Sequence, residues 1–303
     1  MKSQTDNIAK EDAYTLALFA QDEIKLLRNL QALIGVRYIY HENFKNHATP
    51  NVALMYKPGK FNFRASYAAG FRTPTLSELY ATDIAKKNDR LTIGNLDLKP
   101  EKNNYFSLSA EYVHERFSVS VNAFYNNIRD MIDYNTIATG DKAMEQYGHK
   151  EVRQRDNIAE AKVHGINVSA NAYLGAGFNL SGGYTHLNTQ DVELEQPIDK
   201  SIKNAYNINA QWAHSWKIYR LNINLNGRIN SKRFSKSYGY APEYQLWDLN
   251  TRHSFNLKSV IIEPGFGMEN LFDYMDDRPY NSNYATLTPG RSFYISLSLK
   301  FKS

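Results

Sequence analysis

Apolar and polar residues alternate with a period of two along most of this chain of 303 residues. Residues 221–226 read Leu-Asn-Ile-Asn-Leu-Asn, so every second side chain is aliphatic and every other one is an amide. The pattern returns in residues 106–112, 117–125 and 293–301. Successive side chains of a β-strand point to opposite faces, so this period predicts strands with one apolar and one polar face. Its repetition favours a transmembrane β-barrel with lipid outside, a polar lumen inside and all backbone groups paired between strands.

Counting these segments predicts about thirteen strands. They span residues 14–26, 30–42, 48–57, 60–71, 101–114, 117–134, 151–173, 178–190, 202–214, 219–231, 244–257, 260–270 and 290–301. Short connections are predicted at 27–29, 57–59, 114–116, 174–177, 216–218 and 258–259, and long ones near 72–100, 135–150, 191–201, 232–243 and 271–289. Outer-membrane barrels have short periplasmic turns and longer outer loops, so the alternating lengths support the same fold.

Composition agrees with this class and excludes others. The chain has no cysteine, so it has neither disulfides nor thiolate metal sites. A net charge of +5 is too small and too scattered to indicate nucleic-acid binding. The sequence lacks a continuous apolar run of about 18 residues, which excludes a transmembrane helix but not membrane-spanning strands. The 22 tyrosines and 15 phenylalanines fit the aromatic girdles of a barrel.

Two conspicuous segments flank a loop of about 28 residues, unusually long for a compact soluble domain. Residues 71–80 read Phe-Arg-Thr-Pro-Thr-Leu-Ser-Glu-Leu-Tyr, and residues 94–102 read Gly-Asn-Leu-Asp-Leu-Lys-Pro-Glu-Lys. Together they resemble the paired signature of TonB-dependent outer-membrane receptors, which usually reads Phe-Arg-Ala-Pro and Asn-Pro-Asp/Asn-Leu. Here Thr73 replaces the Ala and Leu96 replaces the Pro. Residues 269–273, Glu-Asn-Leu-Phe-Asp, resemble the segment that commonly precedes the last strand in this family.

The resemblance extends from about residue 14 to the C-terminus and implies a fold and an organisation. We expect residues 14–303 to form the C-terminal part of an antiparallel transmembrane β-barrel in the outer membrane of a Gram-negative bacterium. Residues 1–13 have no apolar h-region and are expected to be the leader of a fragment, without a signal peptide. Plugged transporters of this membrane have 22 strands, so the chain would supply about thirteen of them without the plug. Two open sheet edges would make the isolated chain prone to aggregate.

The resemblance also implies a function. Receptors of this kind capture a scarce nutrient and release it through a plug that is driven by TonB. The expected ligand is a ferric siderophore, with haem or cobalamin as alternatives, and the expected partners are outer-membrane lipid and TonB. TonB would be reached through an N-terminal plug that lies outside these residues. We expect no cofactor, no nucleic acid and no enzymatic activity.

The candidate site residues are Arg72, Glu78, Tyr80, Asn95 and Asp97, which lie at the two stems of the long loop. In one interpretation, arginine and tyrosine contact an anionic or aromatic ligand at the barrel mouth. In the other, Arg72 pairs with Glu78 or Asp97 and holds the geometry of the loop. The residues alone leave both interpretations open.

A haem ligand would require a histidine. In haem receptors that resemble this pattern, a histidine between the two signature segments is expected to bind iron, but residues 75–94 contain none. This absence weakens the haem assignment, although His149 in the next long loop could serve as the ligand. We therefore predict no metal site, and we keep His149 as a candidate for ligand binding.

Three other classes remain as alternatives. A passive porin-like channel would show the same alternation without the paired signature. A soluble β-sandwich binding module would bury the apolar faces against a second sheet. An enzyme is disfavoured because the eight histidines are dispersed and no nucleophile–base pair can be named.

Overall fold

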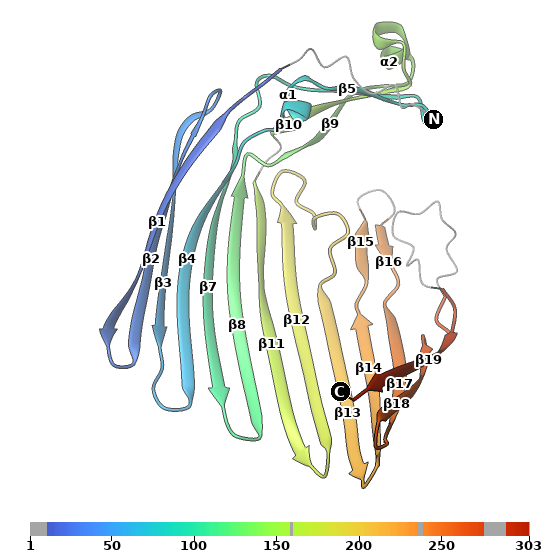
Figure 1. Ribbon diagram of the computed structural model, residues 1–303. Coiled ribbons are helices and arrows are strands. Elements are labelled where there is room, and N and C mark those ends of the chain that lie inside the picture. The colour runs from blue at the N-terminus through green and yellow to red at the C-terminus, as the bar shows by residue number, and fades with distance from the viewer. Residues whose placement is uncertain (1–10, 158–159, 236–238, 276–288, 303) are drawn as a thin grey trace.

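A single antiparallel sheet of thirteen strands makes up most of the molecule (Figure 1). The computed structural model describes residues 11–157, 160–235, 239–275 and 289–302. The strands are β1 (Thr15–Leu27), β2 (Leu30–His41), β3 (Lys45–Tyr56), β4 (Phe61–Arg72), β7 (Glu101–Val113), β8 (Phe117–Arg129), β11 (Ala161–Gly175), β12 (Phe178–Asp191), β13 (Asn204–Trp216), β14 (Tyr219–Asn230), β17 (Tyr244–Asn256), β18 (Val260–Glu269) and β19 (Ser292–Phe301). They are hydrogen-bonded in this order. The predicted number of strands is confirmed, and the sheet is open, with β1 and β19 at its edges.

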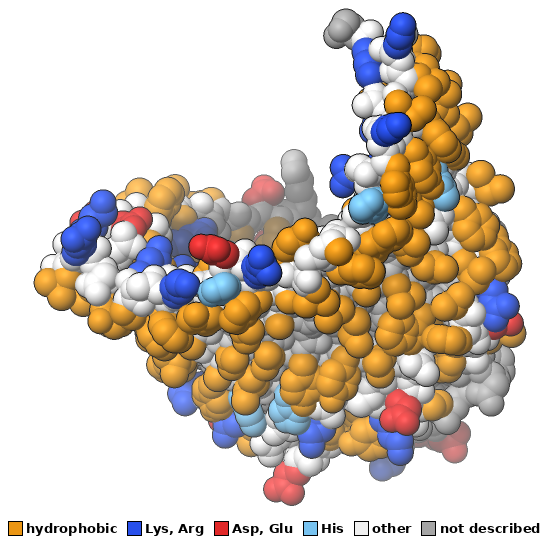
Figure 2. Space-filling model, turned by 90° about the horizontal axis from the view of Figure 1, so that it is seen from below, with side chains coloured by type: hydrophobic (Ala, Val, Ile, Leu, Met, Phe, Trp, Pro, Cys, Tyr) orange, Lys and Arg blue, Asp and Glu red, His pale blue; other side chains and the backbone are white. Residues whose placement is uncertain are grey.

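The two faces of this sheet differ as the alternation predicts. The outward aliphatic side chains are exposed, with Leu108 at 63%, Val121 at 41% and Ile295 at 83% of their maximal accessible surface. Seen from below, the sheet is curved and hydrophobic side chains gather on its outer side (Figure 2). A β-sandwich would cover these side chains with a second sheet, and the described residues contain no such layer. The soluble sandwich alternative is therefore wrong.

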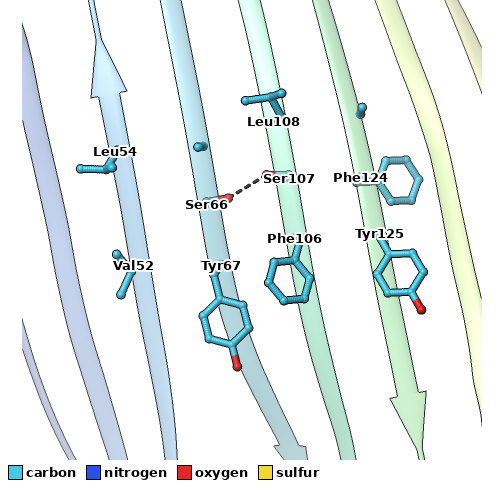
Figure 3. A pocket seen from close by; sticks show the side chains of 11 residues that line it. Val52, Leu54, Ser66, Tyr67, Phe106, Ser107, Leu108, Phe124 and Tyr125 are labelled. Carbon is cyan, nitrogen blue, oxygen red and sulfur yellow. Dashed lines mark hydrogen bonds between the residues drawn. The ribbon is translucent and has the colours of Figure 1, made fainter.

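A shallow groove of about 550 Å³ lies on the apolar face across β3, β4, β7 and β8 (Figure 3). Leu54, Tyr67, Phe106 and Leu108 form its walls, where alternate residues of the strands point outward. The serines at the intervening positions form hydrogen bonds of their own, as in the 2.7 Å bond between the Ser66 and Ser107 hydroxyls (Figure 3). The groove is thus part of the outer apolar surface.

Side-chain hydrogen bonds connect neighbouring strands on the inner face. Asn62 donates to Glu111 at 2.7 Å, and Asn209 donates to both Asn224 and Asn226 at 2.6 Å. These bonds satisfy polar groups that lipid could not solvate, so this face suits an aqueous or protein-filled lumen.

The connections are short at one end of the sheet and longer at the other (Figure 1). We call these the short-turn end and the long-loop end. All six predicted short turns lie at the short-turn end, and the strand ends agree with the prediction within about three residues except in two places. One short turn, residues 42–44 between β2 and β3, lies at the long-loop end, so connection length does not separate the two ends completely.

Two predicted strands are wrong because each is divided. The segment 117–134 ends as β8 at Arg129, and β9 (Ile132–Thr139) leaves the main sheet. Asp130 between them has a φ of 54°, which interrupts the extended backbone. The segment 151–173 likewise consists of β10 (Glu151–Asn157) and β11. A tilted strand needs only about 9–11 residues to cross a bilayer, so the surplus residues form structure beyond the long-loop end.

That structure is a four-stranded sheet in the order β5-β6-β10-β9, which we call the outer sheet. It combines β5 (Thr82–Ala85) and β6 (Arg90–Ile93) from one loop with β9 and β10 from another, and β6 pairs with β10 in parallel. The helices α1 (Leu76–Tyr80) and α2 (Gly140–Tyr147) belong to the same loops, and β15 (Arg233–Ser235) pairs with β16 (Gly239–Ala241) in a third loop. In the described residues, no helix is both long and apolar enough to cross a membrane.

Candidate functional site

Arg72, the last residue of β4, bridges two carboxylates from different elements. Its Nε and Nη2 donate to the two Glu101 oxygens at 2.7 and 2.6 Å, and its Nη1 donates to Glu78 Oε2 at 2.9 Å. Glu101 begins β7 and Glu78 lies in α1. We call Arg72, Glu78 and Glu101 the Arg72 clamp. The planar guanidinium matches both carboxylates, so the clamp joins the first stem of the loop to its helix and to its second stem.

The local sequence places Glu78 for this contact. Thr75 is the N-cap of α1. Thr75 and Glu78 form a capping box, in which the side chain of each residue accepts a hydrogen bond from the backbone N–H of the other. Partial burial favours the neutral form of Glu78, but hydrogen bonds from Arg72 and Thr75 outweigh this effect and lower its pKa. The carboxylate is therefore held in its charged form at neutral pH.

The second signature segment packs directly on α1. Gly94 N–H donates to the Ala81 carbonyl at 2.8 Å, and Asn95 N–H donates to the Glu78 carbonyl at 3.0 Å. A Cβ on Gly94 would lie 2.4 Å from the Leu79 carbonyl oxygen, which is closer than any real contact. Glycine, which has no Cβ, is therefore the residue that fits this position. The two signature segments thus form one structural unit, stem against stem.

A small hydrophobic cluster completes this unit. Leu79, Leu98 and Ile132 are buried in it, and Tyr80 packs against it together with Phe44. Ile132 also donates its backbone N–H to Glu101 Oε1 at 2.8 Å. The cluster therefore ties α1 to both the second stem and the start of β9.

A second set of contacts fastens the outer sheet. His149 Nδ1 lies 2.9 Å from Asp89 Oδ1, and Lys150 N–H donates to the Asp89 carbonyl at 3.0 Å. The hydrogen bond from His149 lowers the pKa of Asp89. Near the barrel rim, Lys99 N–H donates to Asn157 Oδ1 at 2.7 Å, and Asn157 Nδ2 donates to the Lys99 carbonyl at 2.9 Å. The two loops are therefore joined at both ends of the β6–β10 pairing.

Of the sequence-predicted residues, the structure brings Arg72, Glu78 and Asn95 together. Tyr80 lies at the end of α1 against the cluster, and His149 lies apart from the clamp, beside Asp89. Pairing of Arg72 with Glu78 is confirmed.

Two details of the sequence interpretation need correction. The alternative pairing of Arg72 with Asp97 is wrong, because the second partner is Glu101, while Asp97 is exposed and donates its backbone N–H to Asn95 Oδ1 at 2.9 Å. Sequence reasoning missed Glu101 as a site residue, although Glu101 stands in the second signature segment. The available signal was its place in that segment, whereas its position directly opposite Arg72 comes from the β4–β7 register of the folded sheet.

One face of the outer sheet carries three arginines. Glu151, Arg153 and Arg155 alternate along β10 and share a face, and Arg90 is the register partner of Glu151. The Arg155 guanidinium lies 3.6 Å from the centroid of the Tyr134 ring, a cation–π contact. Arg90 Nε is buried without a hydrogen-bond partner within the described part of the chain. We call Arg90, Arg153, Arg155 and Tyr134 the arginine face.

The segment 269–273 has a structural role. Asn270, with a φ of 52°, donates from Nδ2 to the Tyr274 and Pro289 carbonyls at 2.7 and 3.1 Å, and its own N–H donates to Asp248 at 2.9 Å. It therefore joins β17, the end of β18 and the returning chain. The described residues contain no group of three or more histidine or acidic side chains that could hold a metal ion.

The sequence profile described as "TonB dependent receptor-like, beta-barrel" matches residues 2–271. The chain belongs to the TonB-dependent receptor family. The family assignment and the thirteen-stranded sheet agree, so the fold is part of a TonB-dependent receptor β-barrel.

Solved receptors of similar fold include a variant of the ferric enterobactin receptor of Pseudomonas aeruginosa, with 20% identity and a TM-score of 0.76 over 96% of this chain and 45% of that one. The siderophore receptor PirA of Acinetobacter baumannii has 17% identity and a TM-score of 0.75 over 98% and 47%. The copper transporter OprC has 13% identity and a TM-score of 0.70 over 94% and 47%. This receptor chain thus spans less than half the length of these structures.

Proposed function

We propose that this chain is the barrel part of an outer-membrane receptor that takes up an anionic ferric chelate of the siderophore class, energised by TonB. The family supports TonB-dependent transport, and two of the structurally similar proteins are named for ferric enterobactin or siderophores. Residues 14–303 would belong to the barrel, with membrane lipid around the apolar face. Uptake of this kind needs binding and release only, without covalent chemistry.

The observation that carries the ligand class is the arginine face. Three arginines, Arg90, Arg153 and Arg155, outnumber the two carboxylates of this face, Glu151 and Asp83, so the face keeps a net positive charge, and Tyr134 adds an aromatic ring. Guanidinium groups form charge-assisted hydrogen bonds to the oxygens of an anionic chelate, and the aromatic ring packs on its planar parts. The contacts of the Arg72 clamp and of Asp89 with His149 hold the sheet that presents these groups.

Within this proposal the six sequence-predicted residues divide into two roles. Arg72, Glu78 and Asn95 are positioning residues, because their polar groups are engaged with one another and with the loop backbone. Tyr80, Asp97 and His149 remain candidates for ligand contact. Asp97 is exposed, and His149 keeps its Nε2 atom available while Nδ1 contacts Asp89.

Binding of defined chelates to the refolded chain tests the ligand class. Isothermal titration with an anionic ferric tris-catecholate and with a neutral ferric hydroxamate should give tighter binding of the anionic chelate. Substituting Arg90, Arg153 and Arg155 by Gln should weaken that binding about tenfold or more. The matched control replaces the exposed Lys86, Lys87 and Lys142 of the same loops by Gln. Equal affinity of the parent for both chelates would contradict the proposal.

Haem, cobalamin and cupric ion serve as comparison ligands in the same titration. A haem Soret shift lost in His149→Ala would favour a haem receptor, and tight cupric-ion binding would favour a metal transporter like the copper protein it resembles in fold. Deleting the gene in its host and growing the strain on the ferric chelate as sole iron source tests uptake. Growth that persists when the energising partner is removed would favour the passive porin-like alternative.

A further inference from the structure

The short-turn end carries a repeated pairing of a basic residue with an aromatic one. Five dipeptides at this end have this composition: Tyr56-Lys57, Lys60-Phe61, Arg116-Phe117, Trp216-Lys217 and Phe301-Lys302. They come from four different connections or strand ends that are spread around the sheet. Two further turns add Arg28 and Lys258. The turn positions 57–60, 114–116, 217–218 and 258–259 contain one acidic residue, Glu115, so basic residues predominate in these turns.

The aromatic members lie on the outer, apolar side of the sheet. Phe61 stacks with Phe63, Phe117 packs on Tyr112, and Trp216 stacks on Tyr219 with ring centroids 5.5 Å apart. The ring centroids of Trp212 and Trp216 are 6.1 Å apart, and His214 lies between the two residues along the strand. These rings extend the apolar face to its lower rim, the position of an interfacial aromatic girdle.

The basic members lie immediately beyond this rim and are exposed. Lys57, Lys60, Arg116 and Lys217 are exposed, and none of them forms an ion pair with any described residue. The connection at residues 191–201, at the opposite end, has the reverse composition. It contains Asp191, Glu193, Glu195 and Asp199 against a single lysine.

We propose that the short-turn end binds anionic phospholipid headgroups through these basic side chains, which we call the basic turn set (Lys57, Lys60, Arg116 and Lys217). The rings beside them sit at the boundary of the hydrocarbon, so each cation lies at the depth of a phosphate group. A basic side chain at a membrane surface is attracted to anionic lipid, and one such contact raises the relative affinity about fivefold. A water-exposed protein partner would not require the adjacent outward rings. The inference rests on the membrane setting that the proposed function assumes.

The tryptophans provide the test. The chain has three, and Trp212 and Trp216 lie at the short-turn end, whereas Trp247 lies near the long-loop end of β17. The Trp247→Phe variant, refolded and reconstituted into phosphatidylcholine vesicles, reports on the short-turn end alone. Quenching by brominated phosphatidylglycerol is compared with quenching by the same fraction of brominated phosphatidylcholine. We expect the anionic lipid to quench about fivefold more effectively at low fractions.

Two substituted sets decide whether the basic turn set is responsible. Changing all four residues to Gln should bring the two lipids to equal quenching, whereas the charge-retaining set Lys57→Arg, Lys60→Arg, Arg116→Lys and Lys217→Arg should keep the preference. The matched control, in which exposed lysines 86, 87, 142 and 232 of the long-loop end become Gln, should also keep it.

The outcomes separate the inference from the proposed function. Quenching of the parent by neither lipid would remove the membrane setting and both proposals with it. Quenching by both lipids to the same extent would overturn the headgroup inference alone. A preference that survives in the Gln set would also overturn it, because another surface would then be the binding site.

Discussion

Gly94 and Leu79 approach so closely that a Cβ on Gly94 would lie 2.4 Å from the Leu79 carbonyl oxygen. The two residues come from the two signature segments, which face each other across the loop of residues 72–100. Backbone atoms on both sides make this contact, so neither side can move away independently. The approach explains in physical terms why a glycine opens the second segment.

Gly94→Ala should separate the two segments and destabilise the loop by about 1–3 kcal/mol, the usual cost of overpacking. Limited trypsin digestion at Lys86 and Lys87, which are exposed in this loop, measures the separation as faster cleavage. Gly182→Ala is the control, because its nearest contact would be an ordinary 3.4 Å. Equal cleavage of parent and Gly94→Ala would contradict the assigned contact.

Replacing Arg72 by Lys should weaken the clamp, because an ammonium group cannot hold Glu78 and Glu101 with paired N–H donors. The Arg72 side chain is 43% exposed, so solvent screening limits the expected loss to about 1 kcal/mol. Hydrogen exchange at the Ile132 amide, which donates to Glu101, provides the measurement. Arg64→Lys on the same strand is the control, since its guanidinium contacts only the Met55 sulfur in the described structure.

Loop docking should weaken in acid. The folded state lowers the pKa of Glu78 below its ordinary value of 4.5, so the unfolded loop takes up the proton more readily than the docked one. The contribution of Glu78 is complete above pH 4.5 and is lost as the pH falls through its lowered pKa. Hydroxyl-radical footprinting of Leu79 and Tyr80 between pH 6 and pH 3 measures the exposure.

Glu78→Gln serves as the control for this titration, because Gln keeps the capping box but has no carboxyl group to protonate. Its footprint should change less with pH than that of the parent. Glu101 and Asp89, whose pKa values are also lowered, account for the remaining acid response of the two loops. A footprint that is identical at both pH values in the parent would exclude the predicted linkage.

Leu108→Arg distinguishes lipid from water on the outer face. A leucine that is 63% exposed to water could be replaced with little effect, within about 0.5 kcal/mol, as at ordinary surface sites. In a bilayer the same change should cost about 2–4 kcal/mol. Urea unfolding in vesicles measures the difference, and Asn122→Arg on the inner face is the control. A small change in the free energy of unfolding for Leu108→Arg would contradict the barrel assignment.

The sequence predicted the main sheet well because one physical cause acts on every strand. Lipid on one side and a polar lumen on the other impose the period of two. Residues 221–226 show this period in the sequence, and the same residues alternate between the two faces of β14 in the structure. The number of strands in the main sheet and the six short turns followed from this pattern.

The outer sheet was not predictable in the same way. Its strands are short, and β6 meets β10 through parallel pairing between residues about 60 positions apart, which no local pattern indicates. Asp130 looks like a strand residue in the alternation, and its positive φ depends on contacts that only the fold supplies. The clamp was half predictable: Glu78 lies six residues from Arg72, whereas Glu101 meets it only through the β4–β7 register.

The parallel pairing of β6 with β10 also sets an order of assembly. The hairpins that are joined at the short-turn end close over a few residues, so each of them can form by itself. The outer sheet has to wait until β4, β7, β8 and β11 stand side by side, since only then are the two loops near enough to meet. The outer sheet, which carries the proposed ligand-binding face, is therefore completed only after the strands beneath it have paired.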